Sequence, residues 1–223
     1  MSAGIEAVVS DFGGVLTTPL FQIFAALQEE DRIEQGAMGG ALRRIAERDG
    51  AHPLHELECG RMTEHDFLSE LSAQLRADLG RDVEMLSFAE RYFAHLEPNE
   101  AMIAFLRELR RDGYRLAMLT NNVREWEARW RAMLPVDELF DVVVDSAFVG
   151  MRKPDPAIYR LTCDRLGVAP ERCLFVDDVE PNCATAADLG MTAVLFRSSE
   201  QAIAEMREAL AKAQLSQPRR SQR

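Results

Sequence analysis

Acidic, hydroxyl and lysine side chains stand where four short apolar runs of the sequence end. Asp11 follows the first run, Thr120 the second and the pair Asp177-Asp178 the fourth, while Lys153 lies a few residues beyond the third. Carboxylates with oxygen-type neighbours suit a hard cation such as Mg²⁺, which keeps several waters and accepts one or two carboxylates besides substrate phosphate oxygens. A lysine beside them offsets the excess negative charge and can hold a phosphate. These residue types therefore point to magnesium and phosphate chemistry.

Short strands of a sheet must position these side chains. The expected strands are Ile5 to Val9, Leu116 to Leu119, Val142 to Val144, Cys173 to Val176 and Ala193 to Phe196. Helical patterns separate them: apolar residues recur at i, i+3, i+4 and i+7 from Met102, and Asp155 opens another helix at Pro156. This alternation predicts an α/β fold with a doubly wound, mostly parallel, Rossmann-like sheet. Ligands bind beyond the C-terminal strand ends of such sheets, where the polar residues are expected.

The strand pattern disappears between Thr18 and Glu97, where apolar residues recur at helical spacing. Breaks between helices are expected at Gly36 to Gly40, at Pro53 and at Gly80. We therefore expect residues 18–95 to form a helical insertion and residues 1–17 and 96–213 to form the core that contains the sheet. Residues 214–223 are expected to be a disordered basic tail.

The charge of the chain limits its partners. Its 223 residues include 26 lysines and arginines against 37 aspartates and glutamates, which gives a net charge of −11 at pH 7. Long-range repulsion then argues against nucleic acid or an anionic membrane as a partner. No apolar stretch approaches the roughly 20 residues that span a bilayer, so we expect a cytoplasmic protein without a membrane segment. Monomer and homodimer both stay open.

Four stretches carry the polar residues in a fixed order. They are Val8 to Thr17 (VVSDFGGVLT), Met118 to Asn122 (MLTNN), Val149 to Pro156 (VGMRKPDP) and Leu174 to Asn182 (LFVDDVEPN). Together they resemble the motifs of the haloacid dehalogenase superfamily, whose hydrolases use an aspartate nucleophile, and the helical insertion matches that superfamily's cap. The sequence looks most similar to the branch with the phosphatase domain of soluble epoxide hydrolases and the bacterial glucose-1-phosphate phosphatases.

The resemblance implies a Mg²⁺-dependent phosphatase that hydrolyses a small-molecule phosphomonoester. Asp11 would be the nucleophile that attacks phosphorus and forms an aspartyl-phosphate. Thr120 would hydrogen-bond the phosphoryl oxygens with Asn121 beside it. Lys153 would neutralise the nucleophile and the transferring phosphoryl group.

The resemblance also implies a metal site and one departure from the family pattern. Asp11, Asp178 and the backbone carbonyl of Gly13 would ligate Mg²⁺, with Asp177 and Asn182 supporting this shell. The usual phosphatase motif has a second aspartate at position 13, where it protonates the leaving oxygen and later activates water. Gly13 keeps the carbonyl but lacks this acid/base group, which is typically worth ~10²–10⁴-fold in rate.

Two other functions stay open. The first is a 2-haloacid dehalogenase-like hydrolase, whose nucleophilic aspartate also lacks the second aspartate but which works without metal; the pair Asp177-Asp178 argues against it. The second is a non-catalytic protein that binds a phosphorylated ligand and has lost turnover together with the acid at position 13. Binding of Mg²⁺ and a phosphate analogue without phosphate release would distinguish it.

Further residues of the sequence receive no assigned role. Trp126 and Trp130 lie four apart on an expected helix, where the pattern favours packing in the core and leaves a dimer face or a substrate wall open. The stretch His55 to Arg61 resembles a recurrent segment of the cap in this branch. Arg61 could meet a substrate anion, but the pattern favours a solvated helix end. The four histidines show no metal-ligand spacing.

Overall fold

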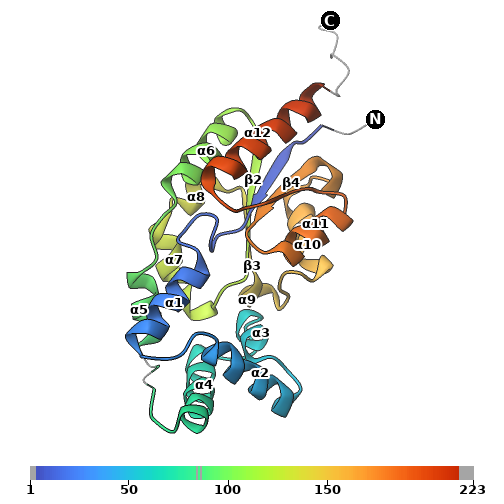
Figure 1. Ribbon diagram of the computed structural model, residues 1–223. Helices are drawn as coiled ribbons and strands as arrows, with labels where there is room; N and C mark the ends of the chain where they lie inside the picture. The colour runs from blue at the N-terminus through green and yellow to red at the C-terminus, as the bar shows by residue number, and fades with distance from the viewer. Residues whose placement is uncertain (1–3, 84, 86, 216–223) are drawn as a thin grey trace, which may run out of the picture.

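A five-stranded parallel sheet forms the centre of the computed structural model, which describes residues 4–83, 85 and 87–215 (Figure 1). The strand order is β3-β2-β1-β4-β5. The strands are β1 (Ala7–Ser10), β2 (Arg115–Thr120), β3 (Val142–Asp145), β4 (Cys173–Asp177) and β5 (Thr192–Leu195). All four strand pairs are parallel. The predicted α/β fold and its five strands are confirmed.

Helices cover both faces of the sheet because successive strand residues point to opposite sides. Val8 and Leu116 pack under α6 (Glu100–Arg111) and α12 (Ser199–Leu215). Their neighbours Val9 and Ala117 pack under α10 (Pro156–Leu166) and α11 (Glu180–Asp188). Figure 1 shows these two helix pairs on either side of the strands. Asp155 caps α10 as predicted, since its side chain accepts a hydrogen bond from Ala157 N–H.

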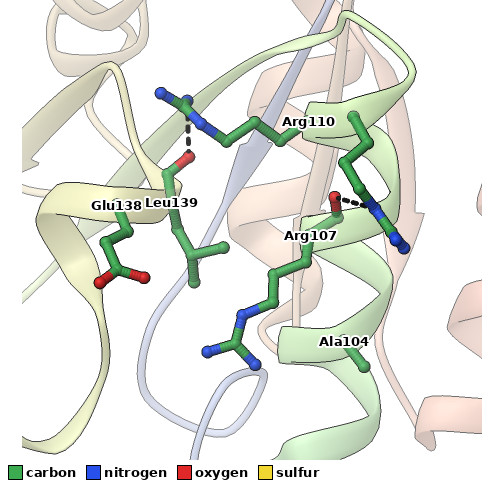
Figure 2. A pocket seen from close by; sticks show the side chains of 6 residues that line it. Ala104, Arg107, Arg110, Glu138 and Leu139 are labelled. Atoms are coloured by element: carbon green, nitrogen blue, oxygen red, sulfur yellow. Dashed lines mark hydrogen bonds between the residues drawn. The ribbon is translucent and has the colours of Figure 1, made fainter.

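Short helices occupy the connections around the sheet. They are η1 (Arg124–Trp126), α7 (Glu127–Met133), α8 (Val136–Leu139), α9 (Ser146–Val149) and η2 (Pro170–Arg172). Arg110 of α6 fixes one of them, because its Nη1 donates to the carbonyl of Leu139 at 3.0 Å (Figure 2) and to Asp141 Oδ1 at 2.9 Å. Asp141 in turn accepts from Leu116 N–H through Oδ2 at 2.9 Å. These bonds attach α6 to the start of β3.

Among the described residues of the expected insertion there are five helices. They are α1 (Leu20–Glu30), α2 (Ala37–Asp49), α3 (Pro53–Glu58), α4 (Glu64–Leu79) and α5 (Phe88–Ala94). In Figure 1, α2, α3 and α4 lie at the opposite end of the molecule from the two termini. The breaks predicted at Pro53 and Gly80 are confirmed, since Pro53 begins α3 and Gly80 follows α4.

The predicted break at Gly36 to Gly40 is wrong except for its first residue. Gly36 precedes α2, but the helix begins at Ala37 and continues through Gly39 and Gly40. Met38 and Ala41 of this segment are buried with Ile45 on one side of the helix. Burial of that apolar side outweighs the low helix propensity of glycine.

Hydrogen bonds join the two ends of the insertion. Thr17 pairs with Pro98 in an isolated antiparallel bridge, and Thr18 N–H donates to the Glu97 carbonyl at 2.9 Å. Asn99 closes the joint, because its N–H donates to the Leu16 carbonyl at 2.8 Å. The chain therefore leaves the core and returns to it at one place.

The C-terminal helix is longer than expected. The sequence predicts a tail from residue 214, but α12 includes Gln214 and Leu215 because its buried residues keep helical spacing up to Ala213. Residues 216–223 of the predicted tail lie outside the described residues. Of the helices in the described part of the chain, none combines the length and apolar character needed to cross a membrane.

Candidate active site

The predicted polar residues meet at the C-terminal edge of the sheet. Thr120 and Asp177 are the last residues of β2 and β4, and Asp11 directly follows β1. In the pairing of β1 with β4, Ser10 lies opposite Val176, so Asp11 and Asp177 each stand one residue further along adjacent strands. The structure thus brings together carboxylates that are 166 positions apart in the sequence (177 − 11).

Lys153 bridges two of these carboxylates. Its Nζ lies 2.7 Å from Asp11 Oδ1 and 2.6 Å from Asp177 Oδ2, and only 1% of its side chain is exposed. Asn121 positions the lysine backbone: its Oδ1 accepts from Lys153 N–H at 2.8 Å, and its Nδ2 donates to the Lys153 carbonyl at 3.0 Å. Both ends of the Asn121 amide are therefore engaged with the loop that carries Lys153.

Asp177 accepts structural hydrogen bonds in addition to pairing with Lys153. It is completely buried, and its Oδ1 accepts hydrogen bonds from Val179 N–H at 2.8 Å and from Asn182 Nδ2 at 3.0 Å. Its Oδ2 contacts Lys153. These bonds hold Asp177 in place, and Asp177 in turn fixes the lysine next to Asp11.

A third carboxylate completes an acidic group. One carboxylate oxygen from each of Asp11, Asp177 and Asp178 lies within 4.8 Å of the other two. The three carboxylates carry more negative charge than the ammonium of Lys153 neutralises, and every atom that they offer to a metal is an oxygen. The group therefore suits a hard divalent cation. Gly14 leaves space for the Asp178 carboxylate, because a Cβ at position 14 would collide with it. The φ of Gly14, +83°, also disfavours other residues there.

Burial dominates the electrostatics of the group. It raises the pKa of Asp11 to about 8, with Lys153 opposing this shift and the charges of Asp177 and Asp178 adding to it. Burial alone would lower the pKa of Lys153, but the neighbouring charges of Asp11 and Asp177 outweigh it and raise that pKa. The pKa of Asp178 is also raised, first by burial and then by Asp177. The pocket thus disfavours further negative charge and favours an added cation.

Thr120 presents a hydroxyl with little internal hydrogen bonding. The residue is 1% exposed, and its Oγ1 makes one long contact of 3.4 Å with the Asn121 carbonyl. Such a hydroxyl has capacity left for a ligand oxygen. Thr120 lies in the wall of the cavity that also contains Asp11 and Lys153.

This cavity has a volume of about 900 Å³ and extends from the acidic group to the inserted helices. All the predicted site residues except Asp177 line it: Asp11, Gly13, Thr120, Asn121, Lys153, Asp178 and Asn182. Asp177 lies just behind this wall, hydrogen-bonded to Asn182. Trp126 and Trp130 also line it. Trp130 is completely buried in the hydrophobic core and Trp126 packs against that core, so the packing favoured by the sequence pattern is confirmed.

Glu58 and Arg152 also line this cavity, and the sequence patterns predicted neither of them. Glu58 Oε2 accepts from Arg152 Nε at 2.6 Å, and burial raises the pKa of Glu58. The resemblance of residues 55–61 to a recurrent segment is a signal for Glu58, although Arg61 is the residue of that segment that could meet a substrate anion. Arg61 is half exposed, pairs with Glu56 at 2.7 Å and is absent from the cavity lining, so the solvated helix end is the better description.

A second pocket lies elsewhere, between α6 and α8 (Figure 2). Arg107, Arg110 and Arg111 line it together with Glu138 and Leu139. It shares no residue with the cavity at Asp11. Arg110 is already bound to Leu139 and Asp141, so this pocket is part of the packing between the helices.

Comparison with known proteins identifies the family of this chain. The sequence model of one family, described as haloacid dehalogenase-like hydrolase, matches residues 5–190. The chain belongs to this hydrolase family. The resemblance drawn from the four motifs is confirmed, and haloacid dehalogenase-like hydrolases are also its structural neighbours.

Relatives within the family include phosphatases. Phosphatase MT3486 of Mycobacterium tuberculosis is 32% identical over 208 residues, which cover 88% of this chain and 89% of that protein. Bifunctional epoxide hydrolase 2 of Sus scrofa is 26% identical over 91% of this chain. The chain spans only 19% and 38% of the lengths of the first two mammalian relatives that it matches.

A solved structure supports the same fold. The haloacid dehalogenase family enzyme bt-2542 of Bacteroides thetaiotaomicron, in complex with magnesium and inorganic phosphate, has a TM-score of 0.62 and 21% identity. The similarity covers 87% of this chain and 95% of that one. At this identity the similarity concerns the fold.

Proposed function

We propose that this hydrolase is a magnesium-dependent phosphatase that cleaves a small-molecule phosphomonoester. The observation that carries the proposal is the buried Lys153, whose ammonium lies between Asp11 and Asp177 at the edge where the cavity begins. A carboxylate paired with an ammonium at a cavity end is suited to attack a phosphoryl group, because the ammonium can neutralise charge that develops during transfer.

Asp11 performs the first displacement. Its carboxylate oxygen attacks phosphorus, the bond from phosphorus to the alcohol oxygen breaks, and the alcohol leaves with the bonding electrons and takes up a proton. Water then attacks phosphorus and releases inorganic phosphate and the free Asp11 carboxylate. Thr120 hydrogen-bonds the phosphoryl oxygens, Lys153 stabilises their charge, and Asn121 positions Lys153 through its backbone.

The acidic group would hold Mg²⁺. Asp11, Asp178 and the carbonyl of Gly13 are the proposed ligands, and Asp177 with Asn182 keeps the surrounding hydrogen bonds in place. The cation, when bound, would supply charge neutralisation for the phosphoryl oxygens. We further propose that residues 18–95 are a cap that keeps bulk water from the site, with residues 1–17 and 96–213 as the catalytic core.

Two features favour the phosphatase over the dehalogenase. The acidic group has three carboxylates, more than a nucleophile alone requires. The relative with 32% identity over nearly its full length is named a phosphatase.

Phosphate release tests the proposal. Turnover of p-nitrophenyl phosphate and of sugar and nucleotide monophosphates should require Mg²⁺ and should be lost in Asp11→Asn. Asp164→Asn, an exposed change on α10, is the matched control and should keep wild-type rates. Binding of Mg²⁺ and vanadate without any phosphate release would contradict the proposal and indicate a non-catalytic protein.

The position of solvent oxygen separates the two hydrolase mechanisms. In single turnover in H₂¹⁸O, attack of water on phosphorus places ¹⁸O in inorganic phosphate and leaves Asp11 unlabelled. A dehalogenase passes through a carbon ester, and attack of water on its carbonyl labels the aspartate. Mass spectrometry of the peptide that contains Asp11 reads the difference, and label in that peptide would contradict the phosphatase.

A further inference from the structure

The cavity beyond the acidic group has a mainly hydrocarbon wall. Side chains from α1, α2, α4 and α5 converge there, among them Phe24, Leu42, Leu71 and Phe88. Trp126, which follows β2, closes the wall from the core side, where it stacks on Tyr92 with ring centroids 4.7 Å apart. The polar residues of the proposed catalytic machinery gather at one end of this space.

Three of the polar side chains elsewhere in the wall, Glu64, Glu58 and Gln28, are engaged with protein groups. Glu64 Oε1 accepts from Trp126 Nε1 at 2.9 Å, and Glu58 Oε2 accepts from Arg152 Nε at 2.6 Å. Gln28 Nε2 donates to the Phe24 carbonyl at 3.1 Å. Gln28 Oε1 and Trp130 Nε1 have no partner among the described residues, but both atoms are buried below the surface of the wall.

A hydrocarbon wall favours a hydrophobic alcohol over a sugar as the alcohol part of the substrate. A sugar carries several hydroxyls, and each would lose its bonds to water in a wall of aromatic and aliphatic carbon. A hydrocarbon needs no such partners and gains free energy when it leaves water. The volume of about 900 Å³ lies near the upper end for ligand sites, which leaves room for a group on the order of ten carbons or more.

We propose, on the basis of the phosphatase function above, that the substrate is the monophosphate ester of a hydrophobic alcohol. Its phosphate lies at Asp11, Thr120 and Lys153. Its long-chain or polycyclic hydrocarbon part occupies the space between Leu42, Leu71 and Trp126. The inserted helices thereby select the alcohol, while the sheet edge handles the phosphoryl group.

A series of linear alkyl monophosphates from butyl to decyl tests this, assayed below micelle-forming concentrations. The value of kcat/KM should rise about fourfold per added methylene until the cavity is filled, the equivalent of ~0.8 kcal/mol per buried CH₂. The gain should lie mainly in KM, since the chain binds equally in ground and transition states. Equal rates along the series, or glucose 1-phosphate matching decyl phosphate, would overturn the inference and leave the phosphatase intact.

Two leucines of the inserted helices form a matched pair of variants. Leu42 on α2 lines the cavity and Leu79 on α4 does not, although both are partly buried. Leu42→Asn should lower the ratio of decyl to butyl kcat/KM by about tenfold, because an amide placed in the wall disfavours hydrocarbon. Leu79→Asn should leave this ratio unchanged. Equal ratios in both variants and the wild type would contradict the proposed location.

Binding can be read without turnover. The only two tryptophans of the sequence, Trp126 and Trp130, both line the cavity, so their fluorescence reports its occupancy. Decyl phosphonate, whose carbon–phosphorus bond resists hydrolysis, should change the emission at far lower concentration than butyl phosphonate. The same affinity for both would overturn the inference. A clear preference for decyl phosphonate with no ester hydrolysed would support the ligand class and overturn the phosphatase function.

Discussion

Two adjacent glycines in the turn after β1 have different roles. Gly14 has a φ of +83°, and a Cβ there would collide with Asp178. Gly13 has no positive φ, and a Cβ at that position would meet nothing within 4 Å. Gly14 is therefore required by geometry, whereas Gly13 leaves open space two residues after Asp11. The acid/base group expected there is absent although the backbone could carry it.

An aspartate at position 13 should supply the missing acid/base group. Gly13→Asp is expected to fold normally and to raise kcat/KM for alkyl phosphates, which have poor leaving groups, by roughly 10²–10⁴-fold. The p-nitrophenyl ester should gain much less, because its leaving group needs no proton. Gly13→Asn, with the same shape and no acid, should show none of the gain. A similar gain for both esters would show that the aspartate does not act as an acid.

At the scale of elements, the junction of β3 and α9 contains a buried acid. Asp145 ends β3 and caps α9, since its Oδ1 accepts from Ala147 N–H at 2.9 Å. Its Oδ2 has no partner among the described residues, and the residue is only 6% exposed. Burial raises the pKa of Asp145 from 3.8 to about 7. Below about pH 7 the folded protein therefore favours the protonated form of Asp145.

This acid should make the protein less stable as pH rises. The folded pKa lies above the unfolded one, so the contribution of Asp145 is complete below about pH 4 and is lost as pH rises through about 7. Asp145→Asn keeps the capping oxygen without a charge. From pH 5 to pH 8, the free energy of unfolding of Asp145→Asn should increase relative to that of the wild type by on the order of 2–4 kcal/mol. Urea unfolding measures this, with Asp164→Asn as control. An identical pH dependence in wild type and Asp145→Asn would contradict it.

The sequence patterns predict the strands of the sheet and the residues at its edge, but they do not predict the wall of the cavity. Each strand has a local apolar run, and Asp11, Thr120 and Asp177 follow such runs, so parallel topology was enough to place them at one edge. Gly39 and Gly40 misled because their helix depends on burial of Met38 and Ala41. The cavity wall is made by side chains from separate helices, and no local pattern encodes how those helices pack.

At the scale of the whole molecule, the cavity at Asp11 is lined both by helices between β1 and β2 and by residues that follow the strands. The hydrogen bond from Thr18 to Glu97 joins the two ends of the inserted helices. The side-chain bonds of Glu58 with Arg152 and of Glu64 with Trp126 connect those helices to residues beyond the strands. Ligands that fill the acidic end should therefore stabilise the complete fold.

Mg²⁺ and phosphate together should raise the unfolding temperature. At 100 times the dissociation constant, binding adds about 2.7 kcal/mol to the folded state, or roughly 5–10 °C for a chain of this size. Phosphate alone should give a much smaller shift, because three carboxylates repel it. Asp178→Asn should abolish the joint effect in thermal scans. An unchanged shift in that variant would place the metal elsewhere.

The ion pair of Glu58 with Arg152 joins α3 to the residue that precedes Lys153. Any outward movement of α3 would have to break this ion pair, which is anchored one residue from the ammonium that lies between Asp11 and Asp177. Loss of the ion pair would release α3 from the loop that carries Lys153. The lysine itself would stay in place, because Asn121 holds its backbone and the two aspartates hold its ammonium.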